Sequence, residues 1–206
     1  MKYEVFSGSN IEEIKKEALE KLNLNESEVI FVIDNYSKKG LLKKENYQLK
    51  VYKLTDIVVY IKEFIQELLT KMGVKINSFI DNSKDNQINL TINSDKDALL
   101  IGKEGKNLKA LELVVKQHIH NLINSYPYLI LNVGNYNERH ELYLQNLAKK
   151  IANEVKNTRQ EVIMDNMNSY ERRIVHNALA NIKGVTTISE GEEPNRHIIV
   201  KPNAEK

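Results

Sequence analysis

Residues 101–108 read Ile-Gly-Lys-Glu-Gly-Lys-Asn-Leu, and this stretch decides how the middle of the chain is interpreted. Gly102 and Gly105 stand three positions apart, between two segments with helical periodicity. Because glycine has no Cβ, the backbone there can turn sharply and a ligand can approach it closely. The free N–H groups that open the following helix favour an anion, and three lysines add positive charge: Lys103, Lys106 and Lys109. The stretch therefore predicts a loop that can hold the phosphates of a nucleic-acid strand.

Apolar residues border the loop on both sides. Ile101 and Leu108, together with the edge of the preceding strand, are expected to form a floor for bases. An ordinary turn between two helices is the alternative interpretation of the glycine spacing. A Walker phosphate loop is excluded, because it needs four residues between its glycines and a Lys-Ser or Lys-Thr pair after the second.

The segment around the loop, residues 54–134, is predicted to follow the order α-β-β-α-α-β. Its elements are a helix from Leu54, strands at 74–80 and 88–92, helices at 95–101 and from Lys106, and a strand at 128–133. Apolar residues recur every three or four positions in the two long helices, which predicts one buried face on each. The predicted buried residues are Ile57, Ile61, Phe64, Leu68 and Met72 in the first helix, and Leu111, Val114, Val115, Ile119 and Leu122 in the second.

The N-terminal segment, residues 1–53, is predicted to have the order β-α-β-β. Ser9 or Asn10 can cap its helix, because short polar side chains accept hydrogen bonds from the first helical amides. The run Lys38-Lys39-Gly40 is expected to form a turn between the second and third strands.

The C-terminal segment, residues 135–206, is predicted to have the order α-β-α-β-β. Asn168 with Glu171 three positions later resembles a capping box and opens the second helix, which Gly184 is expected to stop. The last two strands are expected to pair as a hairpin. The fold class is therefore α+β, in three small domains with the bounds 1–53, 54–134 and 135–206.

The second helix of this segment carries a pair of functional candidates. At about 100° per residue, Arg172 and His176 share one flank beside the buried face, whereas Arg173 points almost directly away from the core. A guanidinium and an imidazole on one edge can bond a phosphate and stack with a base. The alternative interpretation is that His176 packs against Tyr170 or caps a neighbour, and that the arginines pair with Glu171.

These motifs resemble a known family. The loop of residues 101–108, within the order α-β-β-α-α-β, is similar to the GXXG loop of a type-II KH domain, which clamps about four nucleotides of single-stranded RNA. Residues 169–176, Ser-Tyr-Glu-Arg-Arg-Ile-Val-His, followed by the run 185–194, resemble the single-strand nucleic-acid-binding domain named for its Arg…His motif. With Phe6-Ser7-Gly8-Ser9 and Lys38-Lys39-Gly40-Leu41 in the first segment, nearly the whole chain resembles the bacterial Jag family.

The resemblance implies a non-enzymatic RNA-binding regulator of the bacterial cytoplasm, linked to control of cell elongation and division. Single-stranded RNA is the implied ligand, with single-stranded DNA as an alternative, and a small KH-only protein or a second copy of the chain is the implied partner. The implied contact loop is Gly102, Lys103, Glu104 and Gly105, with Ile101, Lys106 and Lys109 beside it. The implied second site is Arg172, His176, Arg196 in the last hairpin, and Arg139 in the run 135–140.

Other chemistries find little support in the sequence. The chain has no cysteine, which excludes disulfides, thiol catalysis and thiolate metal sites. His118 and His120 lie two apart in a helix and make a poor metal pair, and His140 is interpreted as a packed or rim histidine. We therefore predict no enzymatic activity, no cofactor and no metal.

A protein–protein scaffold is the main alternative function. The 30 basic and 28 acidic residues leave a net charge of +2, so no general positive field attracts nucleic acid. The segment 1–53 has no recognisable site and is the candidate for protein contacts. No integral membrane segment is predicted, since the most apolar stretch, 54–74, carries several charges.

Overall fold

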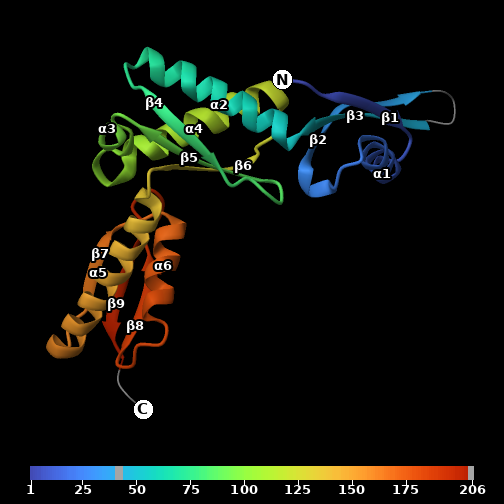
Figure 1. The fold of residues 1–206 in the computed structure, drawn as a ribbon. Helices are drawn as coiled ribbons and strands as arrows, with labels where there is room; N and C mark the ends of the chain where they lie inside the picture. Colours follow the sequence, from blue (N-terminus) through green and yellow to red (C-terminus); the bar gives the residue numbers. More distant parts are fainter. Residues whose placement is uncertain (40–43, 204–206) are drawn as a thin grey trace. The chain divides into compact units, whose positions relative to one another are not determined.

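The computed structural model describes residues 1–39 and 44–203, and for residues 35–39, 44 and 45 it describes the backbone alone. The described chain forms two compact units, residues 1–134 and residues 135–206 (Figure 1). Helices and three small sheets alternate along it, which confirms the α+β fold class. No helix within these described ranges is both long and apolar enough to cross a bilayer.

The first sheet of unit 1 is antiparallel, with the strand order β1-β3-β2. Its elements are β1 (Glu4–Gly8), α1 (Ile11–Leu22), the 3-10 turn η1 (Glu26–Glu28), β2 (Val29–Lys39) and β3 (Lys44–Lys53). Asn10 caps α1 by accepting a hydrogen bond from the Glu12 amide at 3.0 Å, and α1 covers a core that includes Ile14 and Leu49. The predicted turn has Lys38 and Lys39 at the end of β2, while Gly40 lies outside the described residues.

The second sheet of unit 1 has the order β4-β5-β6, with β5 and β6 parallel. The elements are α2 (Leu54–Lys71), β4 (Ile76–Asp81), β5 (Gln87–Ser94), α3 (Asp97–Ile101), η2 (Lys103–Gly105), α4 (Lys106–Ile123) and β6 (Tyr128–Val133). Parallel neighbours need a crossover connection, and here α3, η2 and α4 provide it. The glycine loop at 102–105 therefore sits inside the crossover between β5 and β6.

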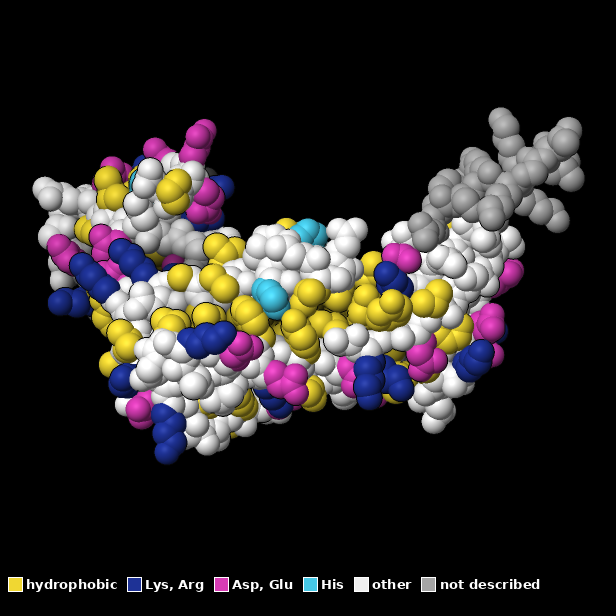
Figure 2. Space-filling model, turned by 90° about the horizontal axis from the view of Figure 1, so that it is seen from above, with side chains coloured by type: hydrophobic (Ala, Val, Ile, Leu, Met, Phe, Trp, Pro, Cys, Tyr) yellow, Lys and Arg dark blue, Asp and Glu magenta, His cyan; other side chains and the backbone are white. Residues whose placement is uncertain are grey.

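The buried faces of α2 and α4 differ in part from the predicted ones. Ile57 and Ile61 on α2 are buried as predicted, but Met72 is 58% exposed, and on α4 Val114 and Leu122 are about half exposed. The face of α2 that meets the sheet includes Ile65 and Leu69 instead. Phe64 lies on a flank of α2 that faces α4, because its ring stacks on that of His118. Figure 2 looks down on these helices and shows a band of apolar side chains, with lysines and carboxylates distributed along it.

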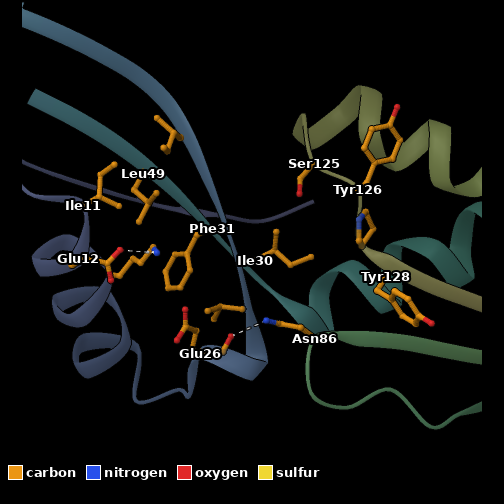
Figure 3. Close-up of a pocket in the computed structure, with 14 residues that line it drawn as sticks. Ile11, Glu12, Glu26, Ile30, Phe31, Leu49, Asn86, Ser125, Tyr126 and Tyr128 are labelled. Carbon is orange, nitrogen blue, oxygen red and sulfur yellow. Dashed lines mark hydrogen bonds and ion pairs between the residues drawn. The ribbon is translucent and has the colours of Figure 1, made fainter.

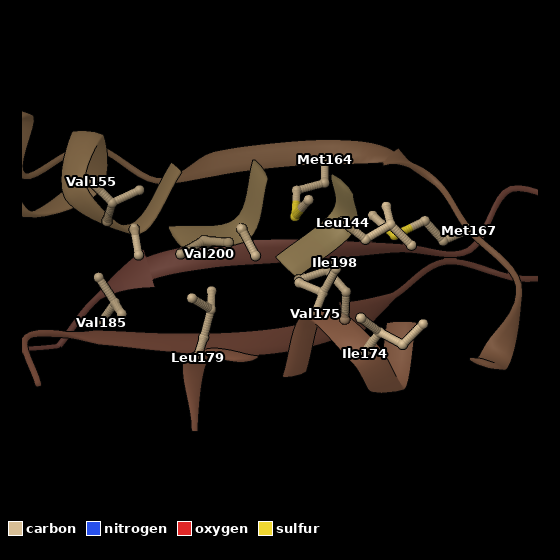
Figure 4. Close-up of a cluster of buried hydrophobic side chains, with 12 residues drawn as sticks. Leu144, Val155, Met164, Met167, Ile174, Val175, Leu179, Val185, Ile198 and Val200 are labelled. Carbon is tan, nitrogen blue, oxygen red and sulfur yellow. The ribbon is translucent and has the colours of Figure 1, made fainter. Parts of the chain in front are cut away.

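Unit 2 packs two helices against an antiparallel sheet with the order β7-β9-β8. Its elements are α5 (Tyr136–Thr158), β7 (Val162–Asn166), α6 (Ser169–Leu179), β8 (Val185–Glu190) and β9 (His197–Pro202). The predicted capping box is confirmed, since the Asn168 side chain accepts from the Glu171 amide and the Glu171 carboxylate accepts from the Asn168 amide, both at 2.9 Å. Figure 4 shows an apolar cluster to which both helices and all three strands contribute.

The core of unit 2 allows a test of how its stability is built. Ile198 on β9 is 2% exposed and belongs to the apolar cluster, whereas Ile163 on the neighbouring strand β7 is 62% exposed. Ile198→Ala is expected to lower the free energy of unfolding by about 2–5 kcal/mol, because it removes buried surface and leaves a cavity. Ile163→Ala serves as the control, with an expected change of about 0.5 kcal/mol. Urea unfolding measures both, and equal losses would contradict the assignment of the two faces.

Candidate nucleic-acid interface

The loop at 102–105 has a backbone conformation that favours glycine. Gly102 has φ 69° and ψ −176°, a combination that essentially only glycine adopts, and Gly105 has φ 72° and ψ 14°. Glu104 between them also has a positive φ, 54°. Three left-handed residues within four positions turn the chain sharply from α3 into α4. Lys103 and Glu104 are left exposed at the tip of the loop.

Asn107 fixes the start of α4 against this loop. Its side-chain amide donates a hydrogen bond of 2.8 Å to the carbonyl of Leu99 in α3. The Asn107 side chain also lies so close to Gly102 that a Cβ added there would approach it to 2.6 Å. Gly102 therefore meets two requirements at once, a positive φ and the absence of a side chain.

The amides at the start of α4 are partly used within the loop. Gly105 donates to the Gly102 carbonyl at 3.4 Å, and Lys106 donates to the Lys103 carbonyl. The prediction of free amides at the start of α4 is therefore wrong for Lys106, because η2 adds a 3-10 turn that takes up this amide. Gly105 is buried and Gly102 is half-buried, so the loop can offer a ligand its exposed tip, Lys103 and Glu104, and the cations around it.

The charged side chains of the loop stay in solvent. Lys103 is exposed and makes no ion pair with any residue that the structure describes, while Lys106 lies 3.8 Å from Glu104 with both side chains about two-thirds exposed. An exposed pair at that distance is weak and screened by salt. Lys109 is exposed on α4, and Ile101 is half-buried. Leu108 is 4% exposed, so it belongs to the core and does not contribute to a floor for bases as predicted.

The structure buries Arg172, which the sequence placed on an exposed edge. Its Nη1 donates to the Met167 carbonyl at 2.6 Å and to the Glu193 carboxylate at 2.8 Å, and its side chain is 10% exposed. The loop between β8 and β9 carries Glu193 and covers the guanidinium. Arg172 therefore joins α6 to that loop in place of offering a free cation.

Two residues of the predicted second site, His176 and Arg196, lie along the seam between α6 and β8. His176 is exposed and its Nδ1 hydrogen-bonds the hydroxyl of Thr187 on β8. Arg196 is exposed and its Nε donates to the hydroxyl of Ser189 at 3.1 Å. Thr187 and Ser189 are two residues apart on β8, and residues with that spacing face the same side of a strand. Their partners His176 and Arg196 therefore lie on the same side of β8. Their exposure leaves both able to contact a ligand.

Arg139 takes no part in that seam. It lies near the start of α5, and its Nε donates to the Asn135 carbonyl at 3.4 Å. The neighbouring His140 bonds the buried carboxylate of Glu171 at 3.0 Å and stacks between Tyr136 and Tyr143. The prediction that His140 is a packed or rim histidine is thereby confirmed.

The two histidines of α4 face different sides of the helix. His118 stacks on Phe64 with ring centroids 4.0 Å apart and bonds the Tyr60 hydroxyl at 3.1 Å. His120 stacks on Tyr126 at 3.8 Å. Within the described part of the chain, no three His, Asp or Glu side chains converge on a point that could hold a metal ion.

Sequence reasoning missed a cavity of about 680 Å³ in unit 1, between α1 and β2 on one side and residues 125–128 on the other (Figure 3). Phe31, Tyr126 and Tyr128 line it, and the last two are exposed by 64% and 59%. Asn86 positions one wall of the cavity. Its backbone N–H donates to the Ser27 carbonyl at 2.9 Å, and its side-chain amide donates to the Glu26 carbonyl at 3.2 Å. The one signal for this cavity in the sequence was the pair of tyrosines that flank Pro127.

Comparison with known proteins defines the class. Residues 59–127 match the family described as "KhpA/KhpB, KH domain". Residues 142–202 match the domain family that is named for its Arg-x-x-x-His motif. The chain thus has a KH domain followed by an Arg…His domain.

Three curated relatives carry the name "RNA-binding protein KhpB". The protein from Clostridium symbiosum is 37% identical over 67% of this chain and 63% of its own length. The Streptococcus pneumoniae (strain D39) protein is 31% identical over 76% of this chain and 48% of its own length, and the Bacillus subtilis protein is 28% identical over 94% and 95%. The chain therefore spans about half to two-thirds of the first two relatives and nearly all of the third. The chain belongs to the Jag family, to which these proteins are assigned.

The contact between Gly102 and Asn107 can be tested by a double-mutant cycle. Gly102→Ala is expected to cost about 1–3 kcal/mol for the strained backbone angles. It should cost more in addition, because the new Cβ displaces Asn107 from its bond to Leu99. In an Asn107→Ala background, Gly102→Ala should lower the free energy of unfolding only by the cost of the backbone angles. Gly73→Ala is the control, because Gly73 has φ +73° with nothing within 4 Å of an added Cβ. Urea unfolding gives the four stabilities, and equal costs of Gly102→Ala in both backgrounds would contradict the contact.

The burial of Arg172 predicts a stability effect that its neighbour does not share. Arg172→Ala should lower the free energy of unfolding by about 2 kcal/mol, because it leaves the Met167 carbonyl without its partner. Arg173→Ala, one residue away and exposed, should change it by about 0.5 kcal/mol. Thermal and urea unfolding compare the two variants. A stable Arg172→Ala protein would show that the guanidinium does not hold the loop of β8 and β9.

Proposed function

We propose that the chain binds single-stranded RNA through the loop at 102–105, without enzymatic activity. The observation that carries the proposal is the conformation of that loop, in which Gly102, Glu104 and Gly105 hold left-handed backbone and leave Lys103 exposed and without an ion pair among the described residues. A sugar–phosphate backbone can approach such a main chain closely, and the lysine adds a contact to phosphate. The names of the relatives agree with this ligand class.

The seam between α6 and β8 is the second part of the proposed interface. His176 and Arg196 supply an aromatic ring and a cation on one side of β8. Arg172 contributes indirectly, because it positions the loop that ends at Arg196 by bonding Glu193. Single-stranded DNA is the competing ligand, since phosphate contacts and base stacking are common to both polymers.

The family membership extends the proposal to cellular function. We infer that the protein acts in the bacterial cytoplasm as an RNA regulator linked to cell elongation and division, with a small KH-only protein as partner. The three-domain division at 53/54 and 134/135 belongs to the same proposal.

A protein-docking role is the second candidate function, and the cavity in unit 1 favours it. Its wall combines Phe31, Tyr126 and Tyr128 with few charges, and exposed apolar surface of this kind is typical of protein interaction sites. Residues 1–53 contribute most of its lining, so this role and RNA binding can operate together.

The RNA proposal is tested by a charge reversal at the loop tip. Lys103→Asp is expected to weaken binding of a fluorescein-labelled 20-nucleotide oligouridylate by roughly tenfold or more, because a carboxylate would face the phosphates. About three phosphate contacts at the loop and the α6–β8 seam predict a contribution of about −2 to the slope of log K against log salt of the parent chain. Fluorescence anisotropy at several salt concentrations measures both quantities.

Lys16→Asp is the matched control, because Lys16 is an exposed residue of α1, remote in sequence from the loop. It should bind within about twofold of the parent. If Lys103→Asp binds like this control, or if the parent binds no RNA at all, the proposed function is wrong. A competing 20-nucleotide oligothymidylate decides whether RNA or DNA is preferred.

A further inference from the structure

A groove lies between the two helices of unit 2, on the flank of α6 away from β8. α5 and α6 run side by side (Figure 1) and leave a cavity of about 390 Å³ between them. Residues four apart form its α5 wall, and residues three or four apart form its α6 wall, as helical spacing requires. The walls are Glu141, Gln145 and Lys149 on α5, and Tyr170, Arg173, Ile174, Asn177 and Ala178 on α6.

The groove has a cation on each wall. Arg173 and Lys149 are both exposed, and neither makes an ion pair with any residue in the described part of the chain. The one carboxylate in the groove, Glu141, is already bonded, since Gln145 donates to one oxygen at 3.2 Å and the Tyr170 hydroxyl to the other at 3.3 Å. The two cations are therefore available to an anion, and the local charge is positive.

An aromatic ring stands beside these cations. Tyr170 is 62% exposed, and its hydroxyl bond to Glu141 holds the ring at one end of the groove. Ile174 and Ala178 give the floor an apolar part, and the exposed amide of Asn177 can donate or accept. Cations with an adjacent exposed ring are the combination by which proteins hold unpaired nucleic acid, phosphate on the cation and base on the ring.

The two arginines of the motif thus have opposite environments. Arg172 is 10% exposed and its charge is neutralised by Glu193, while Arg173 is exposed and turned toward α5. The arginine available to a ligand is therefore Arg173. An apolar peptide would leave both cations unpaired in the groove, whereas a phosphate-bearing strand would pair them.

We propose that the α5–α6 groove is a third contact site for single-stranded RNA, in which Arg173 and Lys149 bind phosphates and Tyr170 stacks with a base. The inference rests on the proposed RNA binding and adds a site to it. A strand that also engages the loop at 102–105 gains affinity from both contacts through effective concentration.

The groove is tested in the full chain with the labelled 20-nucleotide oligouridylate. The double variant Lys149→Gln/Arg173→Gln is expected to bind roughly tenfold more weakly, and its slope of log K against log salt should be shallower than that of the parent by about 1.4, because two phosphate contacts are lost. Lys150→Gln/Lys183→Gln removes the same charge from exposed residues outside the groove lining. That control should bind within about twofold of the parent with the same slope, because it removes no phosphate contact.

A second pair of variants tests the ring. Tyr170→Ala should weaken binding about fivefold or more, Tyr170→Phe should retain most of it, and Tyr143→Ala, which removes an equally exposed ring outside the groove, should bind like the parent. If the groove variants match their controls while Lys103→Asp still weakens binding, the groove proposal is overturned and RNA binding through the loop stands. If the parent binds no RNA, both are overturned.

Discussion

A side chain at position 102 would collide with Asn107, and the geometry of the proposed interface depends on that contact. The Asn107 amide bonds the last turn of α3 at the Leu99 carbonyl, so the loop is clamped between the two helices of the crossover. Glycine at 102 allows both the clamp and the unusual backbone angles. The result is a sharp turn whose tip, Lys103 and Glu104, is the part that solvent and a ligand can reach.

In unit 2 the equivalent constraint is an internal ion pair. Arg172 reaches from α6 to Glu193 and to the Met167 carbonyl, so it ties three parts of the unit together before any ligand binds. Because Arg172 is already bonded within the unit, the residues of α6 that can contact a ligand are its neighbours, which lie on two different flanks of the helix. His176 faces β8, and Arg173 faces α5. A single short motif thus combines one stabilising arginine with residues that remain accessible.

Much of the fold follows from the sequence because local signals suffice for it. Apolar periodicity and capping residues gave the order of the elements, and the capping box of Asn168 and Glu171 is the same in sequence and structure. The helix faces were less accurate, since Phe64 contacts His118 on a neighbouring helix, and periodicity alone does not distinguish a helix contact from a sheet contact.

The sequence predicts the backbone turn at the glycines of the candidate site, but it does not predict which side chains the site residues contact. The left-handed positions follow from the spacing of Gly102 and Gly105, but the burial of Arg172 depends on Glu193, 21 residues later. The cavity of unit 1 joins Phe31, Asn86 and Tyr126, which are distant along the chain and carry no common motif. Local motifs therefore do not predict these contacts, because their partners come together only when distant segments pack against each other.

Photo-crosslinking of 4-thiouridine-substituted RNA to the full chain, followed by mass spectrometry of the adducts, tests the central claim most directly. The account predicts crosslinked peptides that contain residues 102–106. Efficient crosslinks confined to other parts of the chain would contradict it.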